Sequence, residues 1–79
     1  MSEQMVSSTE PVYVRLLGEG TSVYRPAAAV HTAPGQALLV APRSYDPEDE
    51  DWEFKPGTHV KLEARVLEGV QVLVAISAV

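Results

Sequence analysis

The chain of 79 residues contains no cysteine, which excludes disulfide bonds, thiolate metal sites and thiol nucleophiles. Aromatic residues are also scarce, with one tryptophan, one phenylalanine and three tyrosines, so a core must be built mainly from aliphatic side chains. No apolar run approaches the length of a membrane helix, since the most apolar stretch is Val70 to Val79. The first five residues also lack the basic and apolar pattern of a signal peptide. We therefore expect a cytoplasmic protein with no membrane partner.

Basic residues are few, because six lysines and arginines stand against eleven acids and give a net charge of −5. Phosphate backbones repel such a chain unless its basic residues cluster, which argues against a nucleic-acid-binding barrel. The length predicts one domain at residues 11–79. The polar, aperiodic residues 1–10 are typical of a flexible tail.

Alternating apolar residues and glycine turns predict an all-β chain. We expect strands at residues 12–17, 22–32, 36–41, 60–66 and 70–76. Turns are predicted at Gly18-Glu19-Gly20, Pro34-Gly35, Pro56-Gly57 and Glu68-Gly69. Pro26 lacks an N–H group, so within the second strand it indicates a sheet edge or a bulge.

The apolar pattern also predicts which faces are covered. The contiguous residues Leu38, Leu39 and Val40 indicate a strand covered on both faces. The fourth strand is expected to direct Val60, Leu62, Ala64 and Val66 inward. In the last strand, the face with Val70, Val72, Val74 and Ile76 lies opposite a half-apolar face that includes Leu73 and Ala75.

Five short strands in fewer than 80 residues favour a small barrel, because curling removes the exposed edges of so small a sheet. The predicted fold is a five-stranded SH3-like barrel. An OB-like barrel is the alternative, although the sequence offers no clear helix between its strands.

The longest predicted connection, between the third and fourth strands, contains an acidic run. Six of the eleven acids fall within eight positions: Asp46, Glu48, Asp49, Glu50, Asp51 and Glu53. Such a run is a candidate docking surface for a protein with a basic surface, since charge complementarity accelerates association. The alternatives are a solvated loop and a divalent cation site, which would need six or more oxygens on a precisely folded loop. No glycine turns this run, so we predict no metal ion and no cofactor.

Trp52 ends the acidic run, and Phe54 follows two residues later. The pair could form an aromatic groove for a peptide, but the only Trp and the only Phe are more easily explained as core residues. Arg15 and Arg25 flank the first turn together with Glu19. They could form a recognition patch with the acidic run, or simply pair across the strands. No motif arranges the serines or the two histidines for catalysis, so we predict that the protein is not an enzyme.

A resemblance to a family of small, uncharacterised bacterial proteins is carried by Tyr13–Leu17, Glu19–Thr21, Val23–Pro26, Tyr45–Glu50, Trp52–Phe54 and Pro56-Gly57. Members of that family share the pattern Y-V-R-L-L-x-E-G-T-x-V-x-R-P, then acids, then W-E-F-x-P-G. The similarity covers about two thirds of this chain. It departs where the family has an acid at Gly18, tryptophan at Tyr24 and cysteine near Leu62. The resemblance implies a soluble β domain and no particular chemistry.

The predicted function is therefore that of an SH3-like binding module. Its candidate surface comprises Asp46, Glu48, Asp49, Glu50, Asp51 and Trp52, with Arg15 and Arg25 nearby. The alternative is a structural β domain that self-associates as a homodimer through Leu73 and Ala75 of the last strand.

Overall fold

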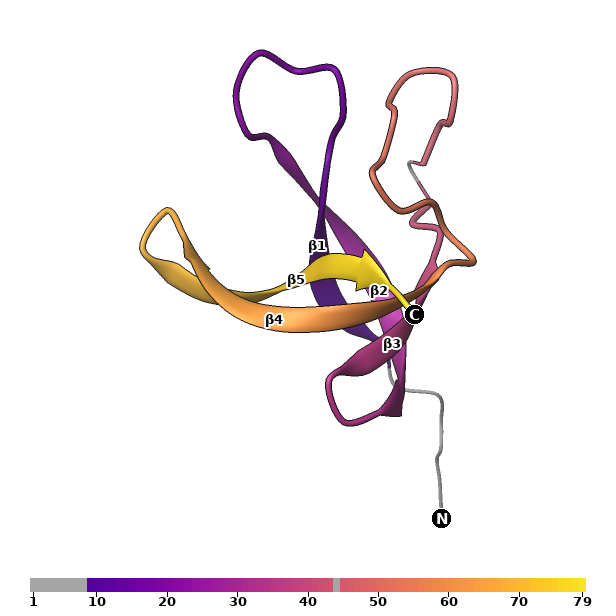
Figure 1. The fold of residues 1–79 in the computed structure, drawn as a ribbon. Helices are drawn as coiled ribbons and strands as arrows, with labels where there is room; N and C mark the ends of the chain where they lie inside the picture. The colour runs from indigo at the N-terminus through magenta and orange to yellow at the C-terminus, as the bar shows by residue number, and fades with distance from the viewer. Residues whose placement is uncertain (1–8, 44) are drawn as a thin grey trace.

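The computed structural model describes residues 9–43 and 45–79, which form a closed barrel of five strands (Figure 1). The strands are β1 (Glu10–Arg15), β2 (Tyr24–Ala33), β3 (Gln36–Val40), β4 (His59–Leu67) and β5 (Val70–Ala78). The described residues contain no helix, and the predicted all-β barrel is confirmed. The predicted tail lies mostly outside the described residues, and its end is corrected because Glu10 already belongs to β1.

The strand order follows the chain order around the barrel. This is a meander, whereas the OB-fold is a Greek key, so the topology agrees with the predicted SH3-like barrel rather than with the OB-like alternative. Four neighbouring pairs are antiparallel. Since five strands of alternating direction leave the first and last pointing the same way, the barrel closes with a parallel contact. That contact consists of one residue pair, Tyr13 with Val74.

The turns follow the local sequence closely. Glu68 and Gly69 have φ values of 50° and 81°, the two positive angles that a two-residue type I′ hairpin requires. Pro26 stands opposite Tyr13 of β1, while pairing of β2 with β3 begins only at Ala28. The missing N–H of Pro26 therefore lies on a stretch of β2 without a β3 neighbour, which confirms the predicted sheet edge.

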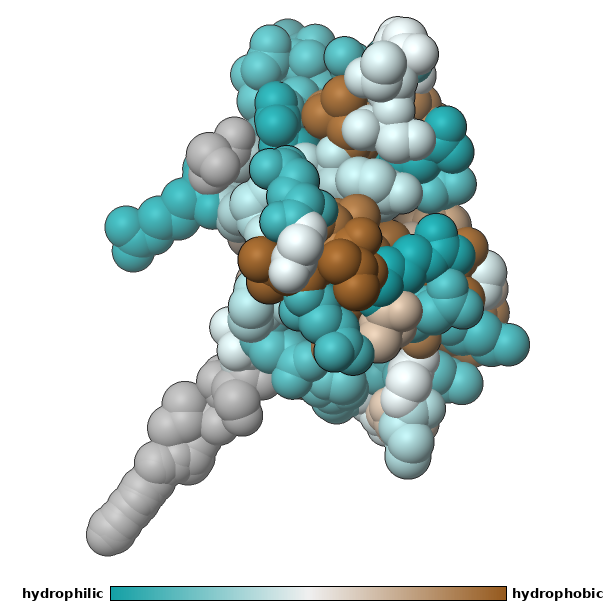
Figure 2. Space-filling view, turned by 90° about the vertical axis from the view of Figure 1, so that its left-hand side faces the viewer, coloured by the Kyte–Doolittle hydropathy of each residue, from teal (hydrophilic) through white to brown (hydrophobic). Residues whose placement is uncertain are grey.

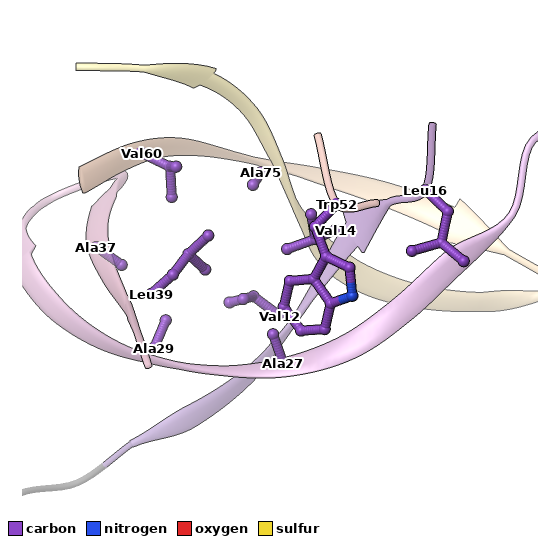
Figure 3. Packing of buried hydrophobic residues seen from close by; sticks show 10 residues of the cluster. All are labelled: Val12, Val14, Leu16, Ala27, Ala29, Ala37, Leu39, Trp52, Val60 and Ala75. Carbon is purple, nitrogen blue, oxygen red and sulfur yellow. The ribbon is translucent and has the colours of Figure 1, made fainter. Parts of the chain in front are cut away.

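The core consists of small aliphatic side chains and one large indole (Figure 3). The residues are Val12, Val14, Leu16, Ala27, Ala29, Ala37, Leu39, Trp52, Val60 and Ala75. Four of these ten are alanines, which leaves room for the indole of Trp52 among Val12, Val14 and Ala27. Trp52 is only 3% exposed, and Phe54 packs against the cluster half-buried. Both aromatic residues therefore belong to the core, as their scarcity suggested.

The prediction that β3 is covered on both faces is wrong. Leu39 is buried, but its neighbours Leu38 and Val40 are 39% and 37% exposed. A five-stranded barrel has one interior, and no second layer of described residues covers the outside of β3. Alternate residues of the strand therefore face solvent although they are apolar.

The β4–β5 hairpin also departs from the prediction, because its outer half projects beyond the barrel (Figure 1). Val60 is buried and Leu62 half-buried, but Ala64 is exposed, and Val66 and Val70 are 68% and 60% exposed. The barrel closes at Val74, so residues beyond it toward the turn have no interior to face.

The last strand has a register shift that changes its two faces. Pairing changes from Lys61–Ser77 to Leu62–Ala75, which leaves Ile76 as the extra residue of a bulge. Val74 and Ala75 are consequently both buried, and Ile76 is 38% exposed. The predicted association surface of Leu73 and Ala75 is therefore wrong, since Ala75 is in the core and Leu73 packs against it.

We predict that Trp52→Ala lowers the free energy of unfolding by about 3 kcal/mol or more, because it leaves a large cavity among small neighbours. Urea denaturation followed by circular dichroism measures this loss. The control is Leu38→Ala, which removes an apolar side chain that is 39% exposed and should cost far less. Equal losses in the two variants would contradict the assignment of Trp52 to the core.

Candidate functional site

The acidic run lies in the connection between β3 and β4, and the main chain of its second half is hydrogen-bonded to residues at the end of β1. Trp52 forms an isolated bridge with Leu16. On either side of it, the Leu17 N–H donates to the Asp51 carbonyl at 2.7 Å, and the Glu53 N–H donates to the Arg15 carbonyl at 2.9 Å. These main-chain bonds and the buried indole together fix the acidic run beside the barrel.

The first half of the run is organised by Asp46. Its carbonyl accepts the N–H groups of Asp49 and Glu50, each at 3.1 Å. Its carboxylate Oδ1 accepts the Glu48 N–H at 2.9 Å. The segment thus makes a single turn with Asp46 in the position of a cap, as the sequence Asp-Pro-Glu-Asp indicates.

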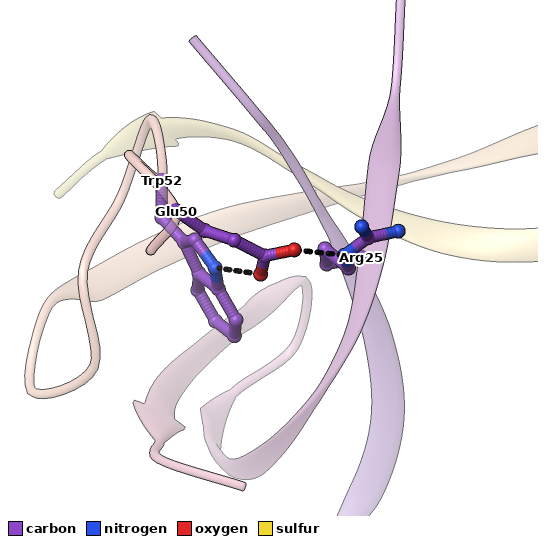
Figure 4. A network of polar contacts seen from close by, with 3 residues as sticks. All are labelled: Arg25, Glu50 and Trp52. Carbon is purple, nitrogen blue, oxygen red and sulfur yellow. Dashed lines mark hydrogen bonds and ion pairs between the residues drawn. The ribbon is translucent and has the colours of Figure 1, made fainter. Parts of the chain in front are cut away.

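Glu50 connects the acidic run to β2 (Figure 4). The Nε of Arg25 donates to Glu50 Oε2, and the indole Nε1 of Trp52 donates to Oε1 of the same carboxylate at 3.2 Å. Arg25 stands opposite the buried Val14, so it occupies the inward-facing row of β2. At the end of that row its side chain reaches the carboxylate above Trp52.

These two hydrogen bonds lower the pKa of Glu50 below its ordinary value of 4.5. The bond from Arg25 has the larger effect, and the bond from the Trp52 indole adds to it. The charged form is favoured because both donors stabilise the carboxylate. Glu50 therefore stays ionised at neutral pH and serves as a structural link.

A depression of about 200 Å³ lies between the acidic run and the start of β2. Its apolar lining includes Pro26, Pro42 and Tyr45, whose ring meets Trp52 edge-on with centroids 4.9 Å apart. Its polar lining includes Asp46 and Asp49, which are exposed. Neither of these two aspartates forms an ion pair with another residue in 9–43 or 45–79. The depression therefore combines an apolar wall with two exposed carboxylates, of which that of Asp46 also accepts the Glu48 N–H through Oδ1.

The structure divides the predicted site residues into three groups. Asp46, Glu48, Asp49 and Asp51 are exposed. Glu50 and Arg25 are joined to each other, and Trp52 is buried beneath them. The prediction that Trp52 contributes contact surface is therefore corrected, because its side chain is buried in the core beneath the acidic run. Arg15 faces away from the site, since it pairs with Tyr24 on the opposite face of the β1–β2 ladder from Arg25.

Three residues of the depression were not singled out in the sequence: Pro26 and Pro42 as lining, and Tyr45 as an aromatic wall. Tyr45 immediately precedes the acids, so an aromatic residue beside an acidic run was the signal available. Pro26 and Pro42 come from distant positions, and only the fold brings them together.

The histidines and acids of the described residues do not converge on a common point. His31 Nε2 lies 2.6 Å from Glu10 Oε1, and His59 bonds to Thr32. No group of three or more potential metal-ligating side chains occurs in residues 9–43 and 45–79.

Comparisons with known proteins add no relative: no family model, no curated protein and no solved structure matches the chain. The resemblance to a bacterial family therefore stays a prediction. Within the part of the chain that the structure describes, no helix has the length and apolar character to cross a membrane.

We predict that Glu50→Gln lowers the free energy of unfolding at neutral pH and that this difference shrinks at acidic pH. Because the pKa of Glu50 is lowered in the folded state, its ionised form stabilises the fold above pH 4.5. This contribution is lost as the pH falls through the lowered pKa. Urea denaturation of both proteins across a pH series measures the difference.

The matched control is Glu48→Gln, which removes the same charge two residues away. Its carboxylate is exposed and makes no hydrogen bond to another described residue, so its loss should change the free energy of unfolding little. A difference between wild type and Glu50→Gln that is constant with pH would contradict the role of the Glu50 charge.

Proposed function

We propose that the protein is a non-enzymatic binding module that docks a basic segment of a partner protein against the acidic run. The observation that carries this proposal is the depression with its apolar wall of Tyr45, Pro26 and Pro42 and its exposed carboxylates of Asp46 and Asp49. A cytoplasmic location belongs to the same proposal, and the absence of cysteine is compatible with it.

An arginine side chain fits this lining best. Its guanidinium can form two parallel hydrogen bonds with a carboxylate and can stack on an aromatic ring such as Tyr45. Its methylene groups would lie on the prolines. A lysine offers the charge but not the planar geometry, so we expect arginine segments to bind more tightly.

The charges around the depression support this choice. Glu50 and Arg25 compensate each other, so the remaining charge of the lining comes from Asp46 and Asp49. The net charge of −5 of the whole chain would also steer a basic partner toward it. A nucleic-acid role has less support, because Arg25 and Arg65 are both engaged with glutamates.

We predict that Asp46→Asn with Asp49→Asn weakens binding of a short arginine peptide about tenfold, because both carboxylates of the depression are lost. The measurement is an NMR titration that follows the amide signals of the acidic run and of Tyr45. A glutamate peptide of the same length should produce no shifts.

The matched control is Glu19→Gln with Glu68→Gln, which removes the same charge from two exposed residues outside the run. This control should bind the arginine peptide nearly as well as the wild type. If both double variants lose affinity equally, the attraction is due to net charge and the proposed site is wrong. Unfolding curves of both double variants show whether the fold stays intact when Asp46, which organises the turn, is replaced.

A further inference from the structure

The outer half of β4 has a strand neighbour on one side only. β3 pairs with β4 through His59, Val60 and Lys61, and the β4 strand then continues to Leu67. Along that continuation β5 is its neighbour on the other side. Among residues 9–43 and 45–79, nothing pairs with the free edge beyond the contact at Leu62.

The hydrogen bonds at the base of the hairpin show which main-chain groups point to the free edge. The Leu62 N–H donates to the Gly35 carbonyl at 2.8 Å, on the side of β3. The His59 carbonyl accepts the Val79 N–H at 2.8 Å, on the side of β5. Because successive residues of a strand alternate between its two edges, Ala64 and Val66 direct their N–H and C=O groups outward.

The side chains of this edge are symmetric about Ala64. Glu63 and Arg65 flank it with opposite charges on one face of the strand, where Arg65 Nε lies 2.6 Å from Glu63 Oε2. Leu62 and Val66 flank it with apolar side chains on the other face. Val66 is 68% exposed, and Val70, which pairs with Leu67 at the end of the hairpin, is 60% exposed.

We propose that two copies of the chain pair antiparallel along this edge, with the twofold axis at Ala64. The two Ala64 residues would then exchange two N–H···O bonds. Gly35 already lies beside Leu62, because its carbonyl accepts the Leu62 N–H, so the pairing is confined to Glu63, Ala64 and Arg65. The result joins the two β4–β5 hairpins edge to edge.

Charge complementarity identifies the occupant as a second copy. In this register Glu63 faces Arg65 of the second copy, and Arg65 faces its Glu63, so both cross-strand pairs attract. Edges that avoid such pairing often carry lysine side chains or a proline. Opposite charges spaced evenly about a centre instead match their own reversed sequence, as a twofold interface requires.

The surface around the edge agrees with this assignment. Figure 2 shows apolar side chains gathered in the middle of the face that carries the end of the β4–β5 hairpin. Beside it lies a groove of about 800 Å³ whose lining includes Tyr13, Tyr24, Val66 and Val70. An edge-to-edge dimer would bring this apolar area next to its copy and reduce the exposure of Val66.

The test is a charge exchange followed by light scattering and sedimentation. Glu63→Arg places two arginines around Ala64, and Arg65→Glu places two glutamates there. Each variant alone should dimerise about tenfold more weakly than the wild type, because both cross-strand pairs become repulsive. An equimolar mixture should restore the dimer as a heterodimer, and the variant with both substitutions should restore the homodimer.

Ala64→Pro provides a second test that does not depend on charge. It removes one outward N–H without touching the bonds to β5, as edge strands tolerate. We expect a folded monomer, with the fold checked by circular dichroism. A wild type that is monomeric at high concentration would overturn the proposal. A dimer that survives Ala64→Pro and both charge reversals would overturn it too. Arginine-peptide binding at the acidic run is measured separately and does not decide it.

Discussion

The burial of Trp52 is the contact on which the rest of the structure depends. The connection between β3 and β4 would otherwise be long and without regular structure, which is uncommon in a domain of this size. The indole enters a core whose other members are aliphatic, and two main-chain bonds then join the residues beside it to Arg15, the last residue of β1, and to Leu17 just after it. One side chain thus completes the core and places the acidic run at the barrel end.

The same indole sets the electrostatics of that end. Its N–H would be costly to bury without an acceptor, and Glu50 supplies one. The second oxygen of Glu50 then holds Arg25, which comes from the inward-facing row of β2. Because this carboxylate is committed to the fold, the count of acids in the sequence overstates the charge available for binding. Asp46 and Asp49 carry the part of it that faces the depression.

The number of strands and their turns follow from local sequence, because alternation and glycine positions act over a few residues. The core role of Trp52 follows from the scarcity of aromatic residues in the whole chain. The burial of side chains on β3 and on the β4–β5 hairpin could not be predicted from local sequence. An apolar run such as Leu38–Val40 indicates a covered strand only where a second layer exists. The bulge at Ile76 leaves no mark in the sequence, yet it shifts the pattern of β5 by one residue. Pairing of Glu50 with Arg25 spans 25 positions and depends on the whole barrel.

The topology itself explains why one edge of β4 has no strand partner among the described residues. An odd number of alternating strands can close only through a parallel pair, and here the ladder of that pair is registered only at Tyr13 and Val74. Strand residues beyond the closure gain nothing from the interior, so the β4–β5 hairpin continues as a two-stranded ribbon. Such a ribbon is marginally stable alone in water. Pairing its free edge with a copy would add main-chain bonds and cover Val66, which stabilises the segment that the barrel leaves least supported.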